Sequence, residues 1–410
     1  MTLRSDCDYI VAEAIRGVLP DTAVRKALEC RDFGPGRIIM VAIGKAAFSM
    51  AKAAKETLGT RIETGVVITK YGHVKGKLEG VTIFEAGHPV PDNNTLKATQ
   101  EALAITKGLK KNDTILFLIS GGGSSLFESP LISLEELKNI TEQFLACGAS
   151  IVEMNTIRKR LSNVKGGRYA EHCRPAKLFS IVLSDIVGDP LDMIASGPAH
   201  ADQSTCAEAY AIIEKYGLSF PDHIMNLIER ETPKMIHNVE TVVTGSVREL
   251  CSSAAKAAEE CGYAPVVLTD SLTIQAREAG SFLAAIGRYN NEISKPMAFI
   301  IGGETVVNII GDGKGGRNQE LALSAAEGIR GLKDMAIFSV GSDGTDGPTD
   351  AAGGFVDGNT ANELEQLGIS IHRILQNNDA YHALQACNGL IFTGATGTNV
   401  NDVAVLLVKR

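Results

Sequence analysis

The stretch "RIIMVAIGKAAFSMAKAAKETLG", from Arg37 to Gly59, decides the class of fold. It opens with a short apolar run, "RIIMVAIG", which predicts a strand buried on both faces of a sheet. The residues from Lys45 onward are rich in alanine and lysine, and they predict a helix that ends at Gly59. A buried strand followed at once by a helix is the repeating unit of an α/β fold.

The same alternation continues along the chain. Asp92 or Asn93 is in position to cap one helix, and Ser133 with Glu136 has the spacing of a capping box at the start of another. Strands that alternate with such helices predict an α/β fold with mostly parallel sheets and helices on both faces. The further predicted strands lie within 65–70, 114–120, 177–185, 241–245, 264–270, 296–304, 335–347 and 404–410.

The length of the chain, 410 residues, exceeds one ordinary hydrophobic core and predicts two domains. The regular pattern breaks at "ERETPKMIHN" (229–238), so we place the boundary there. The prediction is two α/β/α domains, a larger Rossmann-like N-terminal domain (1–235) and a smaller C-terminal domain (236–410). A discontinuous first domain, or a helix that crosses back, fits the pattern as well. The cleft between two such domains is the expected place for an active site.

Composition narrows the possible partners and location. The formal net charge is −8 with no long basic run, which argues against nucleic acid as a partner. The start, "MTLRSDCDYI", lacks the apolar segment of a signal peptide, and no stretch approaches the roughly 20 apolar residues of a membrane span. The eight cysteines form no C-x-x-C pair and are expected to be reduced thiols. We therefore expect a cytoplasmic protein with small-molecule substrates and no membrane partner.

A glycine-rich segment, "SGGGSS" (120–125), follows one predicted strand. Ligands of open parallel sheets bind beyond the carboxyl ends of the strands. There, glycine amides can form a nest for an anion, and Ser124 and Ser125 can add hydroxyl donors. The alternative is a tight turn that needs only positive φ angles. The segment matches neither a Walker A loop, nor G-x-G-x-x-G, nor the G-x-S-x-G elbow of hydrolases.

Basic residues near strand ends offer positive charge for the same anion. Lys45 directly follows "VAIG" at the start of a predicted helix, where its charge adds to that of the helix N-terminus. The run "MNTIRKRLSNVKGGR" (154–168) contains Arg160 and Lys165, on a helix predicted to begin near Thr156. The alternative is that Lys45 and the charged residues of this run are ordinary solvated residues at the protein surface.

Carboxylates also follow strand ends. Asp185 stands where a predicted strand stops, and Asp189 follows in a loop broken by glycine and proline. Such carboxylates can bind a divalent metal or accept a proton from a hydroxyl, although an Asx-turn accounts for at least one of them. Asp343 lies in the glycine-rich "GSDGTDGPTDAAGG" (341–354), which offers oxygen ligands but lacks EF-hand spacing. Asp189 and Asp343 are the candidate magnesium ligands.

A second glycine-rich loop connects Glu304 to Arg317, which opens a predicted helix and can grip a phosphate or carboxylate there. His88 lies in the turn-rich "GHPVPD" and is given a structural role, because no metal-ligand spacing of histidines occurs. Glycine-rich loops, basic residues and carboxylates at strand ends are the parts that phosphoryl transfer needs. The residues alone therefore indicate a small-molecule enzyme that handles an anion, with phosphate favoured, and do not identify the substrate.

Several motifs in order resemble one known family: "IGKAA", "GHPVPD", "SGGGSSL", "MNTIRKRLSNVKGGR", "SDIVGDPLDMIASGP", "GGETVV", "GRNQELAL", "GSDGTDGPTDAAG" and "GTNVND". Together they resemble the glycerate 2-kinase family, whose C-terminal part is called the MOFRL domain. The resemblance extends over most of the chain, from Val41 to Asp402. It implies ATP-dependent phosphorylation of D-glycerate to 2-phosphoglycerate with Mg²⁺ or another divalent cation. It also implies two α/β domains with the active site in the cleft.

The resemblance implies roles for particular residues. Lys45 and Arg317 match the basic residues that hold the substrate, and Asp185 matches a carboxylate near the reacting hydroxyl. These three are the predicted catalytic residues. The substrate or phosphate site is expected to comprise Ser120, Gly121, Gly122, Gly123, Ser124, Ser125, Arg160, Lys165 and Glu304.

Two other functions remain open from the sequence. Members of the family have also been labelled hydroxypyruvate reductases, which would use NAD(P)H, but the chain has no dinucleotide fingerprint with its ribose-binding acid. A non-catalytic protein that binds small organic anions is the other alternative, and the carboxylates at the strand ends argue against it. A homodimer is compatible with the sequence.

Overall fold

The computed structural model describes residues 2–409 and divides into two compact units. The parallel-sheet unit comprises residues 23–184 and 189–244. The mixed-sheet unit comprises the residues up to Thr22, the segment 185–188, and the residues from Gly245 onward. The predicted division at 235/236 therefore needs correction, since the first residues of the chain fold with the last. Met1 and Arg410, the outer ends of the predicted ranges, lie outside the described residues.

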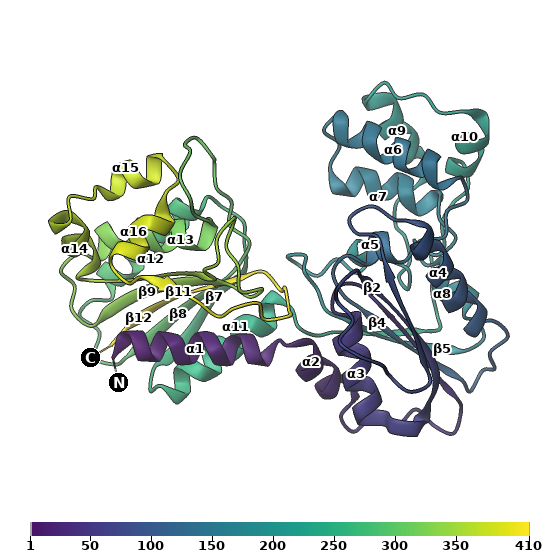
Figure 1. Cartoon of the computed structure of the whole chain (residues 1–410), viewed down its shortest axis with the longest axis horizontal. Coiled ribbons are helices and arrows are strands. Elements are labelled where there is room, and N and C mark those ends of the chain that lie inside the picture. The colour runs from purple at the N-terminus through teal and green to yellow at the C-terminus, as the bar shows by residue number, and fades with distance from the viewer. Residues whose placement is uncertain (1, 410) are drawn as a thin grey trace. The chain divides into compact units, whose positions relative to one another are not determined.

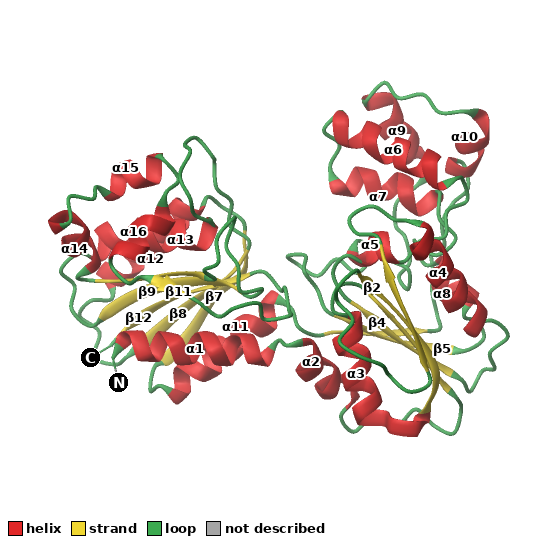
Figure 2. Ribbon diagram, in the orientation of Figure 1, coloured by secondary structure: helices red, strands yellow, loops and turns green. Residues whose placement is uncertain are grey.

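The sheet of the parallel-sheet unit has the strand order β3-β2-β1-β4-β5-β6, and every neighbouring pair is parallel. Both β1 and β4 are buried along their whole length, as expected for strands covered on both faces. Figure 2 shows this sheet in yellow. Its strands are β1 (Ile38–Ile43), β2 (Ile62–Lys70), β3 (Val81–Ala86), β4 (Thr114–Ile119), β5 (Lys177–Val182) and β6 (Val239–Val243).

The helices of this unit begin where local signals predict. Asp92 caps α4 in a capping box with Thr95, and Ser133 caps α6 in a capping box with Glu136. A group of helices, α6, α7, α9 and α10, packs around its own apolar cluster apart from the sheet (Figure 1). The helices are α2 (Pro20–Leu28), whose residues up to Thr22 belong to the mixed-sheet unit, α3 (Ala47–Leu58), α4 (Asn93–Ile105), α5 (Gly123–Leu126), α6 (Leu134–Ala146), α7 (Ile151–Arg160), α8 (Arg168–His172), α9 (Cys206–Lys215) and α10 (Asp222–Ile228), with 3₁₀ turns at Gly59–Arg61 and Ile194–Ser196.

The sheet of the mixed-sheet unit has the order β11-β10-β9-β12-β8-β7. The α/β class is confirmed, and β7, β8, β9 and β11 run in one direction, but β10 and β12 run in the other. The last strand of the chain lies between β8 and β9, antiparallel to both. The strands are β7 (Ala264–Leu272), β8 (Met297–Gly303), β9 (Met335–Gly341), β10 (Gly353–Asp357), β11 (Leu390–Ile391) and β12 (Asp402–Val408).

Helices cover both faces of this second sheet. Figure 1 shows α1 and α11 on one face and α12, α13 and α16 on the other. Each face has its own buried apolar cluster, so the sheet is the middle of three layers. The helices are α1 (Leu3–Gly17), α11 (Val247–Glu260), α12 (Ala276–Tyr289), α13 (Arg317–Ala326), α14 (Thr360–Gln366), α15 (Ile371–Gln376) and α16 (Ala380–Ala386), with a 3₁₀ turn at Glu327–Ile329.

Helix α1 explains why the predicted domain boundary failed. Its apolar face, including Ile10 and Ala14, is buried in one cluster with Leu250 and Ala254 of α11. Nothing local in the sequence reveals which distant helix will cover that face, because the partner lies more than two hundred residues away along the chain. The first helix therefore completes the mixed-sheet unit, although the chain then continues into the other unit.

Candidate active site

The carboxyl ends of β1 and β4 lie side by side in the parallel-sheet unit, since the two strands pair in register. The Lys45 amide donates to the Gly121 carbonyl oxygen (2.9 Å), and the Ala46 amide donates to Ser120 Oγ (3.0 Å). The Ser120 amide in turn donates to the carbonyl oxygen of Ile43 (3.0 Å). The turn that carries Lys45 and the glycine-rich segment are therefore a single hydrogen-bonded structure.

Two glycines permit this close packing. At Gly44 a Cβ would lie 2.3 Å from Ser120 Oγ, so a side chain there would separate the two turns. Gly122 has φ +84, and a Cβ on it would lie 2.9 Å from Cδ2 of His88. Of the consecutive glycines 121–123, Gly122 alone has a positive φ, so turn geometry by itself does not explain the whole run.

His88 adds a residue that the sequence analysis assigned to structure. Its ring lies against Gly122, beside the side chain of Lys45. Burial lowers the pKa of His88, and so do the positive charges of its neighbours, which are Lys45, Lys70 and His73. We call these four residues the basic cluster. The sequence signal for His88 was its place in "GHPVPD", which indicates a turn and does not reveal its neighbours.

The basic cluster adjoins backbone donors that have no protein acceptor. Within residues 2–409, no hydrogen bond uses the amides of Gly121 or Gly122, and no carboxylate pairs with the Lys45 ammonium group. Free N–H groups beside unpaired positive charge are the features with which proteins bind carboxylates and phosphates. This edge of the parallel-sheet unit can therefore hold an anion.

The serines of the segment have mainly internal partners. Ser120 Oγ accepts from Ala46 and donates to the Ile43 carbonyl (3.2 Å), while the Ser125 hydroxyl donates to the Gly122 carbonyl (3.2 Å). Ser124 Oγ accepts a hydrogen bond from Ser196 (3.0 Å). The predicted ligand role of these hydroxyls is thus weaker than that of the glycine amides, because their hydrogen bonds already shape the loop.

Lys165 lies beneath the loop and does not reach a ligand. It is fully buried, and its Nζ donates to the carbonyls of Ser124 (2.7 Å) and Phe127 (3.0 Å) and lies 3.4 Å from Glu128 Oε2. Burial lowers its pKa to about 8, against the opposing effect of Glu128. The prediction that Lys165 contacts substrate is therefore corrected: it holds the C-terminal carbonyls of α5 from below.

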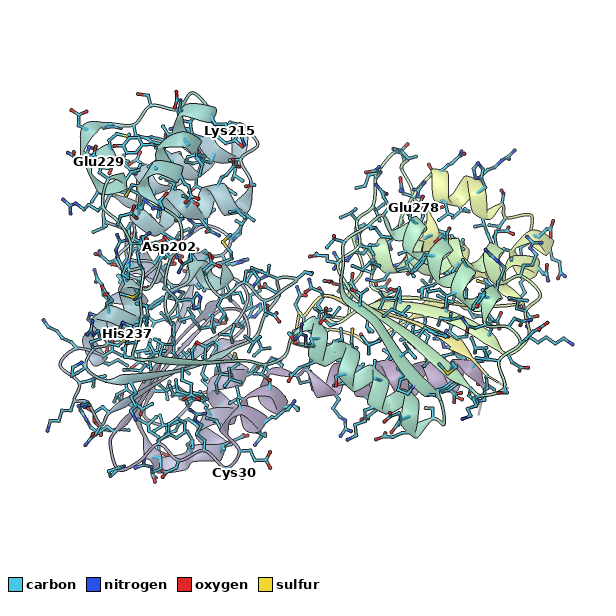
Figure 3. The ribbon with its side chains drawn as sticks, turned by 180° about the vertical axis from the view of Figure 1, so that it is seen from behind. Cys30, Asp202, Lys215, Glu229, His237 and Glu278 are labelled. Atoms are coloured by element: carbon cyan, nitrogen blue, oxygen red, sulfur yellow. The ribbon has the colours of Figure 1, made fainter. Side chains whose placement is uncertain are left out.

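Arg160 is likewise buried away from any ligand. Helix α7 begins at Ile151 after a Ser150 cap, earlier than predicted, and it ends at Arg160. The Arg160 guanidinium is 0% exposed and donates to Thr156 O (2.7 Å) and Ser204 O (2.8 Å). It also lies 3.9 Å from Asp202, which is labelled in Figure 3. The predicted substrate contact of Arg160 is thus replaced by a buried ionic network, because sequence letters do not reveal which charges are covered.

In the mixed-sheet unit, the structure brings together Arg317, Glu304 and Asp185. Arg317 forms a two-bond ion pair with Asp402, in which Nη2 lies 2.9 Å from Oδ1, and its Nη1 lies 3.1 Å from Glu304 Oε1. The amide group of Asn401 donates to Glu304 Oε2 (3.2 Å) and to the backbone carbonyl of Asp185 (3.3 Å). Three predicted site residues therefore belong to one polar network.

Burial and the charges of this network shift the pKa values of Arg317 and Asp402. Burial lowers the pKa of Arg317, but the hydrogen bonds and charge of Asp402 outweigh burial and raise it above its usual value. Burial also raises the pKa of Asp402, against the effect of Arg317. The guanidinium is therefore permanently charged and fixed in direction, with two carboxylates that already balance much of its charge.

Asp346 fills the anion position at the start of α13. Its carboxylate accepts hydrogen bonds from the amides of Asn318 (3.2 Å) and Gln319 (2.9 Å). Burial raises the pKa of Asp346 to about 6, against those two hydrogen bonds. A Cβ on Gly316 would lie 2.4 Å from this carboxylate, so the glycine is needed for the contact. Phosphate binding at this helix N-terminus, one of the possibilities for Arg317, is therefore not supported.

A cavity of about 780 Å³ opens beside the Arg317 network. Asp185, Glu304 and Arg317 line it, together with the glycine-rich loop before α13 and apolar residues of 186–187 and 306–309. Its size lies within the range of roughly 300 to 1,000 Å³ that is usual for small-molecule sites. The mixed-sheet unit thus contains a ligand-sized space next to predicted site residues.

Neither predicted metal ligand lies in a recognisable metal site. Among residues 2–409, no group of three or more His, Cys, Asp or Glu side chains could hold a metal ion. Asp343 accepts the amide of Thr345 (3.0 Å), which is an Asx-turn contact, and Asp189 has positive φ with a buried Oδ1 that lacks a partner. In the same described range, no helix combines the length and apolar character that crossing a membrane requires.

Comparisons with known proteins match the predicted family. Residues 6–229 match a family described as a domain of unknown function, DUF4147, and residues 297–402 match the MOFRL family. D-glycerate 2-kinase of Thermotoga maritima is 51% identical over 405 residues, which are 97% of each chain. The crystal structure of glycerate kinase from the same organism superposes with a TM-score of 0.95 at 50% identity, over 99% of both chains.

A further relative carries a different name. A protein of Agrobacterium vitis, 38% identical over 91% of this chain and 87% of its own length, is provisionally named a hydroxypyruvate reductase. The motifs, the fold and the full-length similarity nevertheless agree, and the resemblance seen in the sequence is confirmed. The chain belongs to the family of glycerate kinases that combine a DUF4147 region with a MOFRL region.

Proposed function

We propose that the protein is a D-glycerate 2-kinase, which transfers the terminal phosphoryl group of ATP to the 2-hydroxyl of D-glycerate. The products are 2-phosphoglycerate and ADP. The observation that carries the proposal is the 51% identity to a D-glycerate 2-kinase over nearly the full length of both chains. The geometry supports it, because an anion site and a carboxylate-lined cavity are both present.

In this proposal the basic cluster binds negative charge of the substrates. Lys45 has no carboxylate partner among the described residues, so its charge is available to a carboxylate or phosphate. The amides of Gly121 and Gly122 add two uncharged donors. Positive charge and preorganised donors stabilise the charge that develops on the transferred phosphoryl group, which is the main catalytic need in phosphoryl transfer.

The chemical step needs a proton acceptor for the 2-hydroxyl. We assign that role to the Asp185 carboxylate: the hydroxyl oxygen bonds to the terminal phosphorus, the bond to the bridging oxygen of ADP breaks, and the proton passes to Asp185. Arg317 supplies positive charge near Asp185, and Glu304 with Asp402 holds its guanidinium in direction. A carboxylate in hydrogen-bond reach of the hydroxyl is the usual base in kinases.

Magnesium enters this proposal with the nucleotide. Mg²⁺ is usually held by one or two carboxylates together with substrate phosphates, and it keeps several waters. The lack of any three-ligand cluster among the described residues fits such a cation better than a resident metal. Asp189 and Asp343, one in each unit, remain predictions as carboxylate ligands, and the chemical contribution of the cation would be to neutralise phosphate charge.

The test is phosphorus NMR of the protein incubated with D-glycerate, ATP and magnesium. A 2-phosphoglycerate resonance is the expected result, and it establishes reaction and regiochemistry together. A 3-phosphoglycerate resonance would retain a kinase but refute the choice of hydroxyl. Absence of any phosphorylated product, with a panel of other hydroxy acids also negative, would refute the kinase and leave an anion-binding protein.

The reductase alternative has a separate test. The turn after β1 is formed by Gly44 and Lys45, with a lysine where a dinucleotide fold has its phosphate-binding glycines. We expect no NADH or NADPH oxidation with hydroxypyruvate, and measurable turnover would overturn this expectation. A cytoplasmic location and a homodimer remain predictions from the sequence.

A further inference from the structure

Carboxylates offset much of the positive charge in the part of the mixed-sheet unit's cavity that lies by Arg317 and Glu304. Arg317 is its cation, and both Asp402 and Glu304 already pair with it. Glu320 also lines the cavity, and its carboxylate pairs with Arg277 at 2.9 Å. Beside Glu304 and Glu320, carboxylates of the lining thus outnumber the guanidinium, and a triphosphate would meet like charge there. This part of the cavity therefore favours an uncharged portion of a ligand.

Most of the remaining lining is apolar. Ile186, Val187, Val307 and Pro348 face the space, and Ile309 on the same loop is 82% exposed. An apolar side chain this exposed at the rim of a cavity gains free energy when a flat apolar ligand covers it. The cavity therefore suits a largely apolar ring system.

One buried hydroxyl in the lining has no partner. Thr305 is 7% exposed, and its Oγ1 makes no hydrogen bond with any described residue. Buried polar groups are nearly always paired, so an unpaired one beside a ligand-sized cavity indicates a ligand atom or a water as the missing partner. The ligand should therefore carry a hydrogen-bonding group as well as an apolar ring.

The loop that forms the cavity wall is already fixed. The Asn378 side chain accepts from the amides of Ile310 (2.8 Å) and Gly311 (3.1 Å) and donates to the carbonyl of Asn308 (3.0 Å). Its amide group also donates to Glu320 (3.1 Å), which carries the Arg277 ion pair. A wall held in this way needs little ordering when a ligand binds, as is common for small-molecule sites.

We propose that this cavity binds the nucleoside part of ATP, with the purine ring against the apolar wall and the ribose hydroxyls toward the carboxylates. A carboxylate is a common acceptor for ribose hydroxyls, and Glu304 keeps lone pairs beyond its two present contacts. The triphosphate extends away from Glu304 and Glu320 and toward Asp185, the proposed base. The inference rests on the proposed kinase function and adds the location and chemistry of the nucleoside site.

The test compares two variants of the full-length chain with a control. Val307→Trp fills the cavity, and Thr305→Val removes the orphan hydroxyl at almost constant shape. Val267→Trp, on the partly exposed strand β7 and outside the lining, is the matched control. We expect Val307→Trp to raise the Kd of ADP, measured by calorimetry, at least tenfold, and Thr305→Val to raise it at least threefold. Val267→Trp should leave it within twofold.

Two further measurements distinguish loss of nucleoside binding from loss of phosphate or glycerate binding. Binding of inorganic tripolyphosphate, which lacks a nucleoside, should be unchanged in Val307→Trp, and the KM for D-glycerate should stay within twofold of the wild type. A folded Val307→Trp protein with wild-type ADP affinity would refute the nucleoside site, and so would unchanged affinity in Thr305→Val if the tryptophan variant does not fold. If Val307→Trp weakens ADP binding but the wild type phosphorylates no hydroxy acid, the proposed function is refuted and the nucleoside site is supported.

Discussion

Lys45 and Lys165 show how one residue type serves opposite purposes a short distance apart. Lys45 is exposed and has no carboxylate partner within residues 2–409, whereas Lys165 is buried against Glu128 and two carbonyl groups. An unpaired ammonium beside free amides can bind a ligand, while a fully satisfied one can only hold structure. At the residue scale, hydrogen-bond partners therefore distinguish a binding lysine from a structural one.

The first prediction concerns Lys45. Lys45→Ala should lower kcat/KM for D-glycerate phosphorylation by about 100-fold or more, since it removes a cation that acts on transition-state charge. The melting temperature should stay within about 2 °C, because the ammonium group has no partner whose loss would cost stability. Lys52→Ala is the control, since Lys52 lies on α3, the helix that follows Lys45, and pairs with Glu56 at 3.8 Å. Retention of full activity in Lys45→Ala would remove this residue from the site.

A second prediction uses the lowered pKa of His88. Its ordinary value is 6.5, and the free protein therefore keeps the ring neutral at pH 7. A bound anion favours the imidazolium, so binding takes up a proton and affinity increases as the pH falls toward the lowered pKa of the free His88 ring. Sulfate is a suitable probe, because its own charge stays constant there. We expect the Kd of sulfate to fall severalfold between about pH 7.5 and 5.5.

His88→Gln should abolish most of that pH dependence. His223→Gln is the control, since His223 lies on α10 and contacts Glu136. His73→Gln measures the contribution of the other histidine in the basic cluster, whose Nδ1 lies 3.0 Å from the Lys45 carbonyl oxygen. A pH profile in His88→Gln that matches the wild type would show that His88 does not face the bound anion.

At the scale of elements, local sequence signals predicted where helices begin, but they did not predict which elements lie beside one another. The caps Asp92 and Ser133 were predictable because a capping box is written in residues three apart. The edge strand β3 was not predicted, and the start of α7 was misplaced by five residues, although Ser150 and Glu153 form a capping box there. The direction of β12 was also missed, because an apolar strand reads alike whether its neighbours are parallel or antiparallel.

The candidate site residues show the same difference between features that local sequence predicts and features that depend on distant packing. The positions of Lys45, Glu304 and Arg317 at the ends of strands or the start of a helix were predictable, and such positions gather at one edge of an α/β sheet. Arg160 and Lys165 were misassigned, since burial depends on long-range packing that the motif does not contain. His88 was assigned a structural role and Thr305 was not singled out, because the surroundings that matter are a neighbour distant in the chain for His88 and a cavity for Thr305.

The third prediction tests the support under the glycine-rich loop. Lys165→Met should destabilise the protein by about 3–5 kcal/mol, because it leaves the buried Glu128 without its cation. Lys165→Met combined with Glu128→Gln should recover part of that loss, since no buried charge is left unpaired. Urea unfolding measures both variants, with the exposed Lys177→Met as the control. A loss below about 1 kcal/mol in the single variant would contradict the proposed role.

The pH dependence of stability should reveal the same group. The folded-state pKa of Lys165 is lowered from 10.5 to about 8, so the unfolded chain binds more protons between these values. Stability contributed by this group is therefore lost as the pH falls through about 8 and is fully present above 10.5. The wild type should become more stable with rising pH across that window, relative to Lys165→Met. Parallel curves would contradict the lowered pKa.

At the scale of the whole molecule, the mixed-sheet unit is assembled from both ends of the chain. Helix α1 buries its apolar face against α11, and Lys409 Nζ lies 2.7 Å from Asp6 Oδ2. Figure 1 shows the N- and C-termini next to each other in this unit. Because the first helix supplies part of one core, the C-terminal half of the chain is an incomplete folding unit on its own.

The last prediction follows from that dependence. A fragment of residues 245–409 leaves the cluster around Leu250 and Ala254 without its cover, and it should bind a hydrophobic dye and unfold without a sharp transition. A rearranged chain in which a short Gly-Ser linker joins residue 409 to residues 2–22 restores α1, and the closeness of Lys409 and Asp6 permits such a linker. It should melt cooperatively, at least about 10 °C above any transition of the fragment.

A second rearranged chain with Ile10→Asp and Ala14→Asp is the control, since it keeps the added length but cannot bury the helix. Equal melting of the fragment and the rearranged chain would show that α1 covers the core without being needed for it.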